Sequence, residues 1–123
     1  MAYSATIKEV SRDISAKERI MLKDTTSAIK LDQATQVEEI HINVDMFAVL
    51  NIHNDKATPT DYENYIIIDH NGTKYVTGSQ SFWNAFNDIY TEMKDEPEEW
   101  SIRVYRHPSK NYSGKDFITC AIE

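Results

Sequence analysis

The stretch YIIIDHNGTKYVTG, residues 65–78, constrains the fold more than any other part of the sequence. Its Asn71-Gly72 dipeptide lies between two runs rich in β-branched and aromatic residues, and it favours a two-residue type I′ turn, which needs positive φ at both positions. Such a turn predicts an antiparallel hairpin in which Asp69 lies opposite Lys74. The register puts one set of side chains on the inner face (Ile66, Ile68, Tyr75) and another on the outer face (Tyr65, Ile67, Asp69, Lys74, Val76).

Strands are predicted on both sides of this hairpin. Residues 39–53, EIHINVDMFAVLNIH, begin with strict alternation of apolar and polar residues, which is typical of a strand with one buried face. Residues 100–107 and 115–123 alternate in the same way and predict a closing pair of strands. Between the hairpin and this pair of strands, apolar residues no longer alternate with polar ones but recur at the spacing of a helix.

The predicted helix covers residues 79–96. Ser79 or Ser81 can cap its start, and Pro97 ends it. Its apolar side chains recur at i, i+4, i+7 and i+11 and form one stripe: Phe82, Phe86, Ile89 and Met93. We expect this stripe to pack against the strands, with Trp83 packing beside it.

The order strand, strand, strand, helix, strand, strand is that of an OB-fold barrel. The sequence therefore predicts a mainly β chain with one helix, an OB-fold-like antiparallel barrel over residues 39–123, within a single domain of residues 1–123. Residues 1–38 become an N-terminal extension: an arm or a short first strand, then two short strands in 19–31 around a turn at Asp24–Ser27. An α+β sandwich with the helix on an open sheet stays as the alternative.

Several classes of enzyme have no motif in this chain. It contains no P-loop, no dinucleotide-binding glycine pattern, no HExxH and no GxSxG. The four histidines are far apart, and the single cysteine, Cys120, falls on the core side of its strand, which predicts a buried, inert thiol. We expect a protein that is not an enzyme and has no cofactor and no metal.

The distribution of charge is uneven. The chain carries a net charge of −7, yet residues 101–117 hold four cations (Arg103, Arg106, Lys110, Lys115) against Asp116 alone, a net of +3, so the rest carries −10. Residues 88–99 are the opposite pole, with six carboxylates against one lysine. A basic segment on an acidic body can bind an anion locally.

Aromatic rings accompany these cations. Arg103, Tyr105 and Phe117 are predicted to share the outer face of the last two strands, and their connection adds Arg106, His107, Lys110, Tyr112 and Lys115. Cations beside exposed rings are what single-stranded nucleic acid requires, because phosphates need neutralising and bases stack on rings. In an OB-fold, oligonucleotides bind at this loop and across strands two and three, so Tyr65 and Lys74 extend the predicted site. The alternative is that the rings fill cross-strand contacts and the cations only solubilise an edge.

Two runs carry a resemblance to a known group of proteins. The join KYVTGS-SF into the helix and the pattern PSKNYxGKDFxTC resemble small single-stranded DNA-binding proteins of phages and mobile elements of Gram-positive bacteria, over about residues 60–122. The resemblance implies an OB-fold and cooperative coating of displaced strands during replication, without catalysis or cofactor. Many cellular single-strand binders end in a flexible acidic tail. This chain ends straight after a predicted strand, so we expect such a tail to be absent or residues 88–99 to serve instead.

The expected function is largely sequence-independent binding of single-stranded DNA during phage or mobile-element replication or recombination, in the cytoplasm of the host cell. The alternative is an acidic interaction protein, or DNA mimic, that docks on a host protein. The partners expected are single-stranded DNA and a replication or host protein bound through residues 88–99; homo-oligomers stay open. No apolar run approaches the roughly 20 residues of a membrane span, so no membrane partner is expected.

Overall fold

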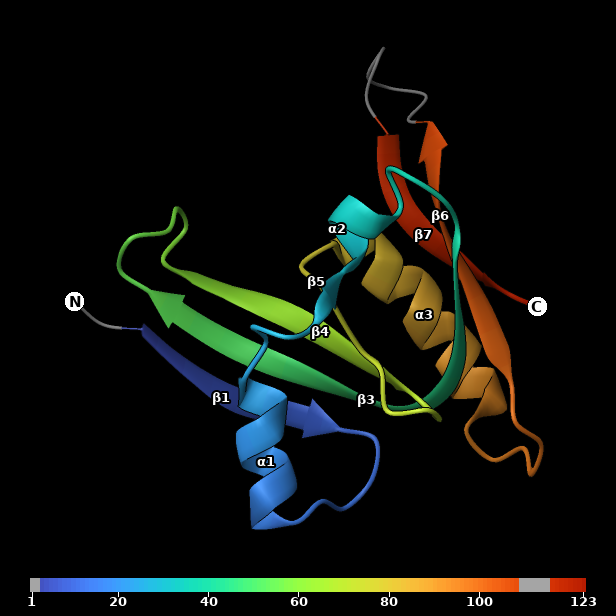
Figure 1. The fold of residues 1–123 in the computed structure, drawn as a ribbon, viewed down its shortest axis with the longest axis horizontal. Helices are drawn as coiled ribbons and strands as arrows, with labels where there is room; N and C mark the ends of the chain where they lie inside the picture. Colours follow the sequence, from blue (N-terminus) through green and yellow to red (C-terminus); the bar gives the residue numbers. More distant parts are fainter. Residues whose placement is uncertain (1–2, 109–115) are drawn as a thin grey trace.

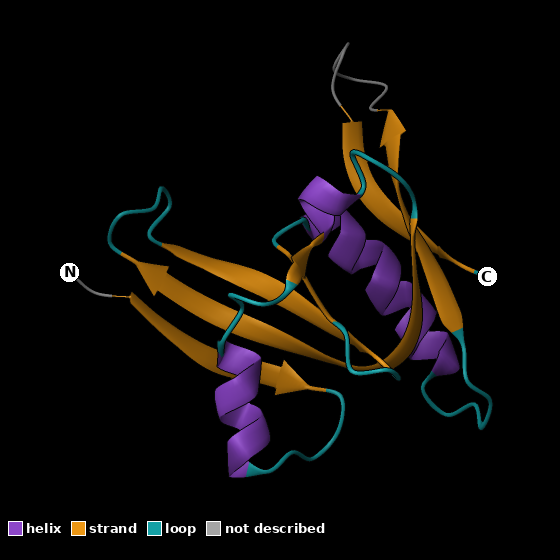
Figure 2. Ribbon diagram, viewed as in Figure 1, coloured by secondary structure: helices purple, strands orange, loops and turns teal. Residues whose placement is uncertain are grey.

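The computed structural model describes residues 3–108 and 116–123 of the chain. The elements follow in the order β1 (Tyr3–Val10), α1 (Ala16–Lys23), β2 (Ile29–Lys30), α2 (Leu31–Ala34), β3 (Ile40–Asn54), β4 (Asp61–Asp69), β5 (Lys74–Thr77), α3 (Gln80–Met93), β6 (Ser101–Pro108) and β7 (Asp116–Ile122). The sheet is strongly curled, and α3 lies in its hollow (Figures 1 and 2).

The long strand β3 organises the sheet. Its first residues pair with β6 over Ile40–Asn43, while its later part pairs with both β4 and β1. The full order is β2-β5-β4-β3-β6-β7, with β1 added on β3. The register of β3 against β4 shifts between Val44 and Met46, a bulge of the kind that bends a strand. One strand can therefore belong to both halves of the curled sheet.

The predicted OB-like fold is confirmed as a mainly β half-barrel. From β3 onward the order is three strands, a helix and two strands, and the first of these strands pairs with the second and the fourth. Within the described residues, β5 and β7 do not pair, so the barrel stays open there. Helices α3 and α2 lie beside this opening: Ser81 Oγ of α3 donates to the Ile118 carbonyl of β7 at 2.8 Å, and Thr77 Oγ1 of β5 donates to Asp32 of α2 at 3.1 Å.

The sheet is buried on both faces. On the hollow side, α3 packs Phe82 and Phe86 against strand residues that include Phe47. On the other side, Leu22 of α1 packs on a second cluster formed by Met46, Ala48, Leu50, Ile52, Ile66 and Val76. Because both faces are covered, residues 46–50 are all buried, and the alternation at the start of β3 gives way to a continuous apolar run.

The N-terminal extension differs from the prediction. Residues 19–31 were expected to form two strands; instead α1 is a helix, only Ile29 and Lys30 are extended, and α2 adds a further turn, so three helices are described rather than one. The cause is a capping box. Ser15 Oγ accepts from the Glu18 amide at 3.2 Å, and Glu18 Oε1 accepts from the Ser15 amide at 3.1 Å. These bonds to Ser15 also lower the pKa of Glu18.

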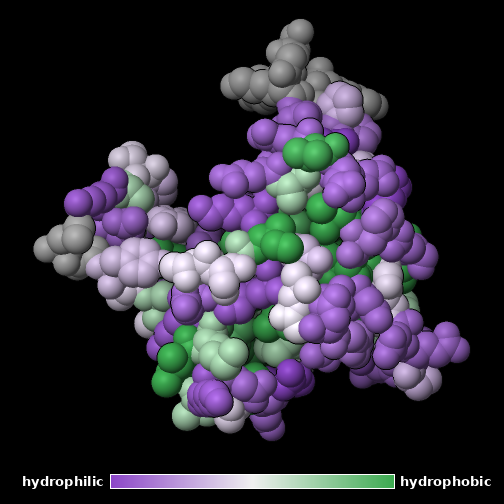
Figure 3. Space-filling model, in the orientation of Figure 1, coloured by the Kyte–Doolittle hydropathy of each residue, from purple (hydrophilic) through white to green (hydrophobic). Residues whose placement is uncertain are grey.

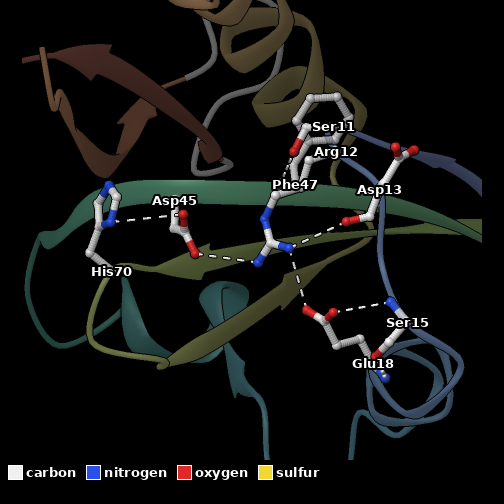
Figure 4. A network of polar contacts seen from close by, with 8 residues as sticks. All are labelled: Ser11, Arg12, Asp13, Ser15, Glu18, Asp45, Phe47 and His70. Carbon is white, nitrogen blue, oxygen red and sulfur yellow. Dashed lines mark hydrogen bonds and ion pairs between the residues drawn. The ribbon is translucent and has the colours of Figure 1, made fainter. Parts of the chain in front are cut away.

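A polar network fixes the start of this helix to the sheet (Figure 4). The Arg12 guanidinium lies 3.4 Å from Glu18 and 3.7 Å from Asp45, a residue of β3. Asp45 in turn lies 3.8 Å from His70 at the β4–β5 turn. The network joins three parts of the chain that are far apart in sequence.

The hairpin exists, but the predicted register is wrong by one residue. Ile68, not Asp69, lies opposite Lys74. Among the described residues only Gly72 has a positive φ, at 91°, so the turn is not type I′. The Gly72 amide donates to the Asp69 carbonyl at 2.8 Å, which makes a type I turn followed by a left-handed glycine. The Asp69 carboxylate accepts the Asn71 amide at 3.0 Å and stabilises this longer turn.

Candidate nucleic-acid interface

The register of β6 against β7 decides which side chains share a face. Tyr105 lies opposite Thr119, and His107 lies opposite Phe117. Alternation then puts four side chains on the outer face, which we call the ring strip: Arg103, Tyr105, His107 and Phe117. The shared outer face predicted for Arg103, Tyr105 and Phe117 is confirmed. His107 belongs to β6 itself rather than to a loop.

The ring strip presents flat surfaces beside a cation. The Arg103 guanidinium lies 4.4 Å from the centre of the Tyr105 ring. The His107 and Phe117 rings are 5.5 Å apart and inclined by 33°. Phe117 is 38% exposed, which is high for a phenylalanine and leaves its ring accessible. Such a strip can stack planar, electron-rich groups and place a positive charge next to them.

Carboxylates lie at one end of the same face. Arg103 Nη1 donates to Glu39 Oε1 at 3.0 Å. On the neighbouring strand His41 lies opposite Arg103, and its Nδ1 is 2.5 Å from Glu123 Oε1. These pairs are exposed, so an arriving phosphate can compete with Glu39 for Arg103 at small cost. Sequence reasoning missed Glu39, His41 and Glu123 here, since only the β3–β6 pairing brings them to the strip.

Arg106 does not join the ring strip. It lies opposite Ile118, on the core side of β6. Its Nη1 donates to Asp116 Oδ1 at 2.7 Å, and its Nη2 donates to the Asp32 carbonyl of α2. The side chain therefore fastens α2 to the β6–β7 pair, and the phosphate contact predicted for it has no support in this geometry.

Tyr65 and Lys74 lie away from the strip as well. Tyr65 is 2% exposed, and its ring stacks on Trp83 with 4.7 Å between centres. Its predicted outer placement is wrong, because Tyr65 is buried in the same core cluster as Tyr75. Lys74 Nζ donates to the carbonyls of Met21 and Asp24, where it caps the end of α1. Burial also raises the pKa of Tyr65, with Glu63 adding to the effect.

The surface on which an OB-fold binds oligonucleotides is covered here. The faces of β4 and β5 that point away from α3 carry Ile66 and Val76, and both are buried under the N-terminal extension with Leu22. The predicted groove over the hairpin therefore does not exist. Among the described residues, the outer face of β6 and β7 stays exposed. Lys110, Tyr112 and Lys115 of the predicted site lie outside the described residues.

Other chemistry is sparse within the described residues. Burial raises the pKa of the Cys120 thiol to about 12, so it is protonated at neutral pH and not a nucleophile. No three or more His, Cys, Asp or Glu side chains of the described part lie together as metal ligands. None of the described helices has the length and apolar character needed to cross a membrane.

Comparison of the chain with protein-family models, with curated proteins and with solved structures finds no match.

Proposed function

We propose that the protein is a non-enzymatic single-stranded DNA-binding protein that uses the outer face of β6 and β7. The observation that carries this proposal is the ring strip, in which one exposed face collects a tyrosine, a phenylalanine, a histidine and an arginine. Stacking surfaces with an adjacent cation suit unpaired bases and their phosphates. The OB-like arrangement of the strands agrees with this class of ligand.

Binding through this strip is largely independent of base sequence. Every base offers a flat face to Tyr105 or Phe117, whereas sequence readout requires hydrogen bonds to base edges. Arg103 exchanges Glu39 for a phosphate when DNA binds. Lys110 and Lys115 are expected to add two more phosphate contacts. Three contacts give a log–log salt slope of about −2 on single strands.

On the basis of the resemblance, we assign this activity to the replication or recombination of phage or mobile-element DNA, in the host cytoplasm. A protein in this role must cover whatever sequence is exposed. The net charge of −10 outside residues 101–117 disfavours binding of the strand to the rest of the protein.

The test is a fluorescence-anisotropy titration of labelled oligo-dT at low salt, with Tyr105→Ala and Phe117→Ala. Each variant loses a stacking surface, so the dissociation constant rises by about fivefold to about 100-fold. Tyr3→Ala, which removes an exposed ring on β1, is the matched control and leaves binding unchanged. Wild-type binding weaker than about 100 µM, or binding that does not weaken as salt rises, contradicts the proposal.

A second candidate is an acidic protein that docks on a host protein. Its support is the six carboxylates of residues 88–99, all on exposed residues and without an ion pair to any described residue. Stoichiometric capture of one host protein, lost on reversal of charges in 88–99 and retained in Arg103→Glu, favours this candidate over DNA binding.

A further inference from the structure

Helix α1 has an outward face that no described residue covers. Three of its cationic side chains are exposed and have no hydrogen bond or ion pair to a described residue: Lys17, Arg19 and Lys23. Between them lie Ile20, which is 71% exposed, and Met21, which is 55% exposed. Hydrophobic surface shows at this position of the molecule (Figure 3). Adjacent exposed apolar side chains flanked by cations form a small patch that a complementary surface can cover.

A groove of opposite character lies at the end of α3. It has a volume of about 650 Å³ and is lined by apolar side chains (Met93, Trp100, Ile122) and by carboxylates (Glu98, Glu99, Glu123), together with Asn43 and Ser101. Ile122 is 48% exposed, although it follows the buried residues Ile118 and Cys120 at the same two-residue spacing in β7. We call this feature the acidic groove.

The two surfaces are complementary in charge, and each also includes apolar side chains. α1 presents two exposed apolar side chains with cations beside them, and the acidic groove presents carboxylates with Met93, Trp100 and Ile122 among them. An eight-residue helix is about 12 Å long, which suits a short groove. Laying the apolar side of a helix into such a groove is a common mode of protein recognition.

The two surfaces cannot meet within one molecule. Figure 1 shows α1 at the lower left and the loop that follows α3 at the lower right of the fold, and α1 and α3 pack on opposite faces of the sheet. The matching surface must therefore come from another molecule. A second copy of the chain supplies both the helix and the groove.

We infer that α1 of one copy docks into the acidic groove of a second copy. The contact joins two different surfaces, so each pair keeps one unused helix and one unused groove, and the assembly can grow head to tail. α1 is a poor nucleic-acid surface by comparison, because it has cations but no ring on which a base could stack. The inference does not depend on DNA binding, since it concerns the protein alone.

The test measures mass by sedimentation velocity without DNA, over a range of concentrations up to about 500 µM, because small charged contacts are weak. We expect the mean mass to rise with concentration in about 50 mM salt and to return to that of the monomer in about 500 mM salt. A wild type that stays monomeric throughout overturns the inference.

Single substitutions test whether the exposed face of α1 takes part in the association. Arg19→Glu weakens association by about tenfold or more, whereas Lys56→Glu, the same charge change on an exposed loop lysine, leaves it unchanged. Ile20→Ser weakens association without altering charge. Retention of wild-type association in both Arg19→Glu and Ile20→Ser overturns the inference, with circular dichroism confirming that α1 has not unfolded.

A mixing experiment tests the pairing itself. K17E/R19E/K23E carries an acidic helix and E98K/E99K carries a basic groove, so each variant alone stays monomeric. The acidic helix of the first fits the basic groove of the second, so an equimolar mixture regains association. A mixture that stays monomeric contradicts the pairing. A second contradicting outcome is a wild type that does not self-associate together with a K17E/R19E/K23E variant that no longer binds oligo-dT, because the cations of α1 then serve DNA binding instead.

Discussion

The two halves of the curled sheet have opposite outer surfaces. Over β4 and β5 the side chains of Ile66 and Val76 are buried beneath the N-terminal extension. Over β6 and β7 the equivalent surface is open, and it carries the ring strip. The difference comes from residues 3–38, which cover one half only. A change in this cover therefore alters stability, whereas a change in the ring strip alters binding.

The largest effect separates a buried ring from an exposed one. Tyr65→Ala removes a ring that is 2% exposed and stacked on Trp83, so the free energy of unfolding falls by about 3–5 kcal/mol. Tyr105→Ala, on the outer face, costs less than about 1 kcal/mol. Urea denaturation monitored by circular dichroism measures both. Similar losses for the two variants mean that the faces are assigned wrongly.

The next largest effect on stability concerns residues 3–38, which cover β4 and β5. Leu22→Ala leaves a cavity where α1 packs on the sheet, since Leu22 is only 3% exposed, and lowers the free energy of unfolding by about 2–4 kcal/mol. Ile20→Ala, two residues away on the exposed side of α1, is the control and changes it by less than about 0.5 kcal/mol. If Leu22→Ala is as stable as its control, the extension does not hold the sheet.

A smaller effect concerns the cap of α1. Ser15→Ala removes the hydroxyl that accepts from the Glu18 amide, at a cost of about 1 kcal/mol. Hydrogen exchange of amides in residues 16–23 should accelerate, while amides of β6 keep their protection. Equal acceleration in both regions indicates that the cap supports the whole fold rather than the cover alone.

The smallest expected effect is a pH dependence at the exposed end of β3. Hydrogen bonds that His53 donates to Asp61 and then to Asp55 raise the pKa of His53, and the bond from His53 lowers the pKa of Asp61. A raised histidine pKa stabilises the fold below the unfolded value of about 6.5, and this contribution is lost as pH rises through the folded pKa. The carboxylate contribution is present above about pH 4 and is lost in more acidic solution.

His53→Asn removes this contribution. The stability difference from wild type is therefore greatest between about pH 4 and about pH 6.5 and declines at higher pH. Thermal melts across pH 4–9 measure the difference, and His41→Asn serves as a second exposed histidine for comparison. A difference that increases above pH 7 has the wrong sign for this explanation.

Prediction from sequence succeeded where one local pattern decided the outcome. The stripe of Phe82 and Phe86 predicts α3, and alternation predicts β3, β6 and β7, because these periods follow from backbone geometry alone. Prediction failed where two local signals competed. Asn71-Gly72 favours a two-residue turn, but the Asp69 carboxylate stabilises a longer one, and a shift of one residue moved Tyr65 to the inner face.

The candidate site divides in the same way. Alternation alone put Arg103, Tyr105 and Phe117 on one face, and the structure agrees. Nothing local to Arg106 shows that it fastens α2, or that Glu39 lies beside Arg103, because both contacts join residues more than sixty positions apart.

From residue 39 onward, the sequence by itself determined which segments are strands and which is the helix, since these follow from the repeat of side chains along a backbone of fixed geometry. Only the tertiary structure decided which faces stay exposed. Covering one half of the sheet requires residues 3–38 to reach across it, and this placement depends on contacts such as Leu22 on Ile66 that no local pattern contains. The position of residues 3–38 therefore decides which surface stays open to a ligand.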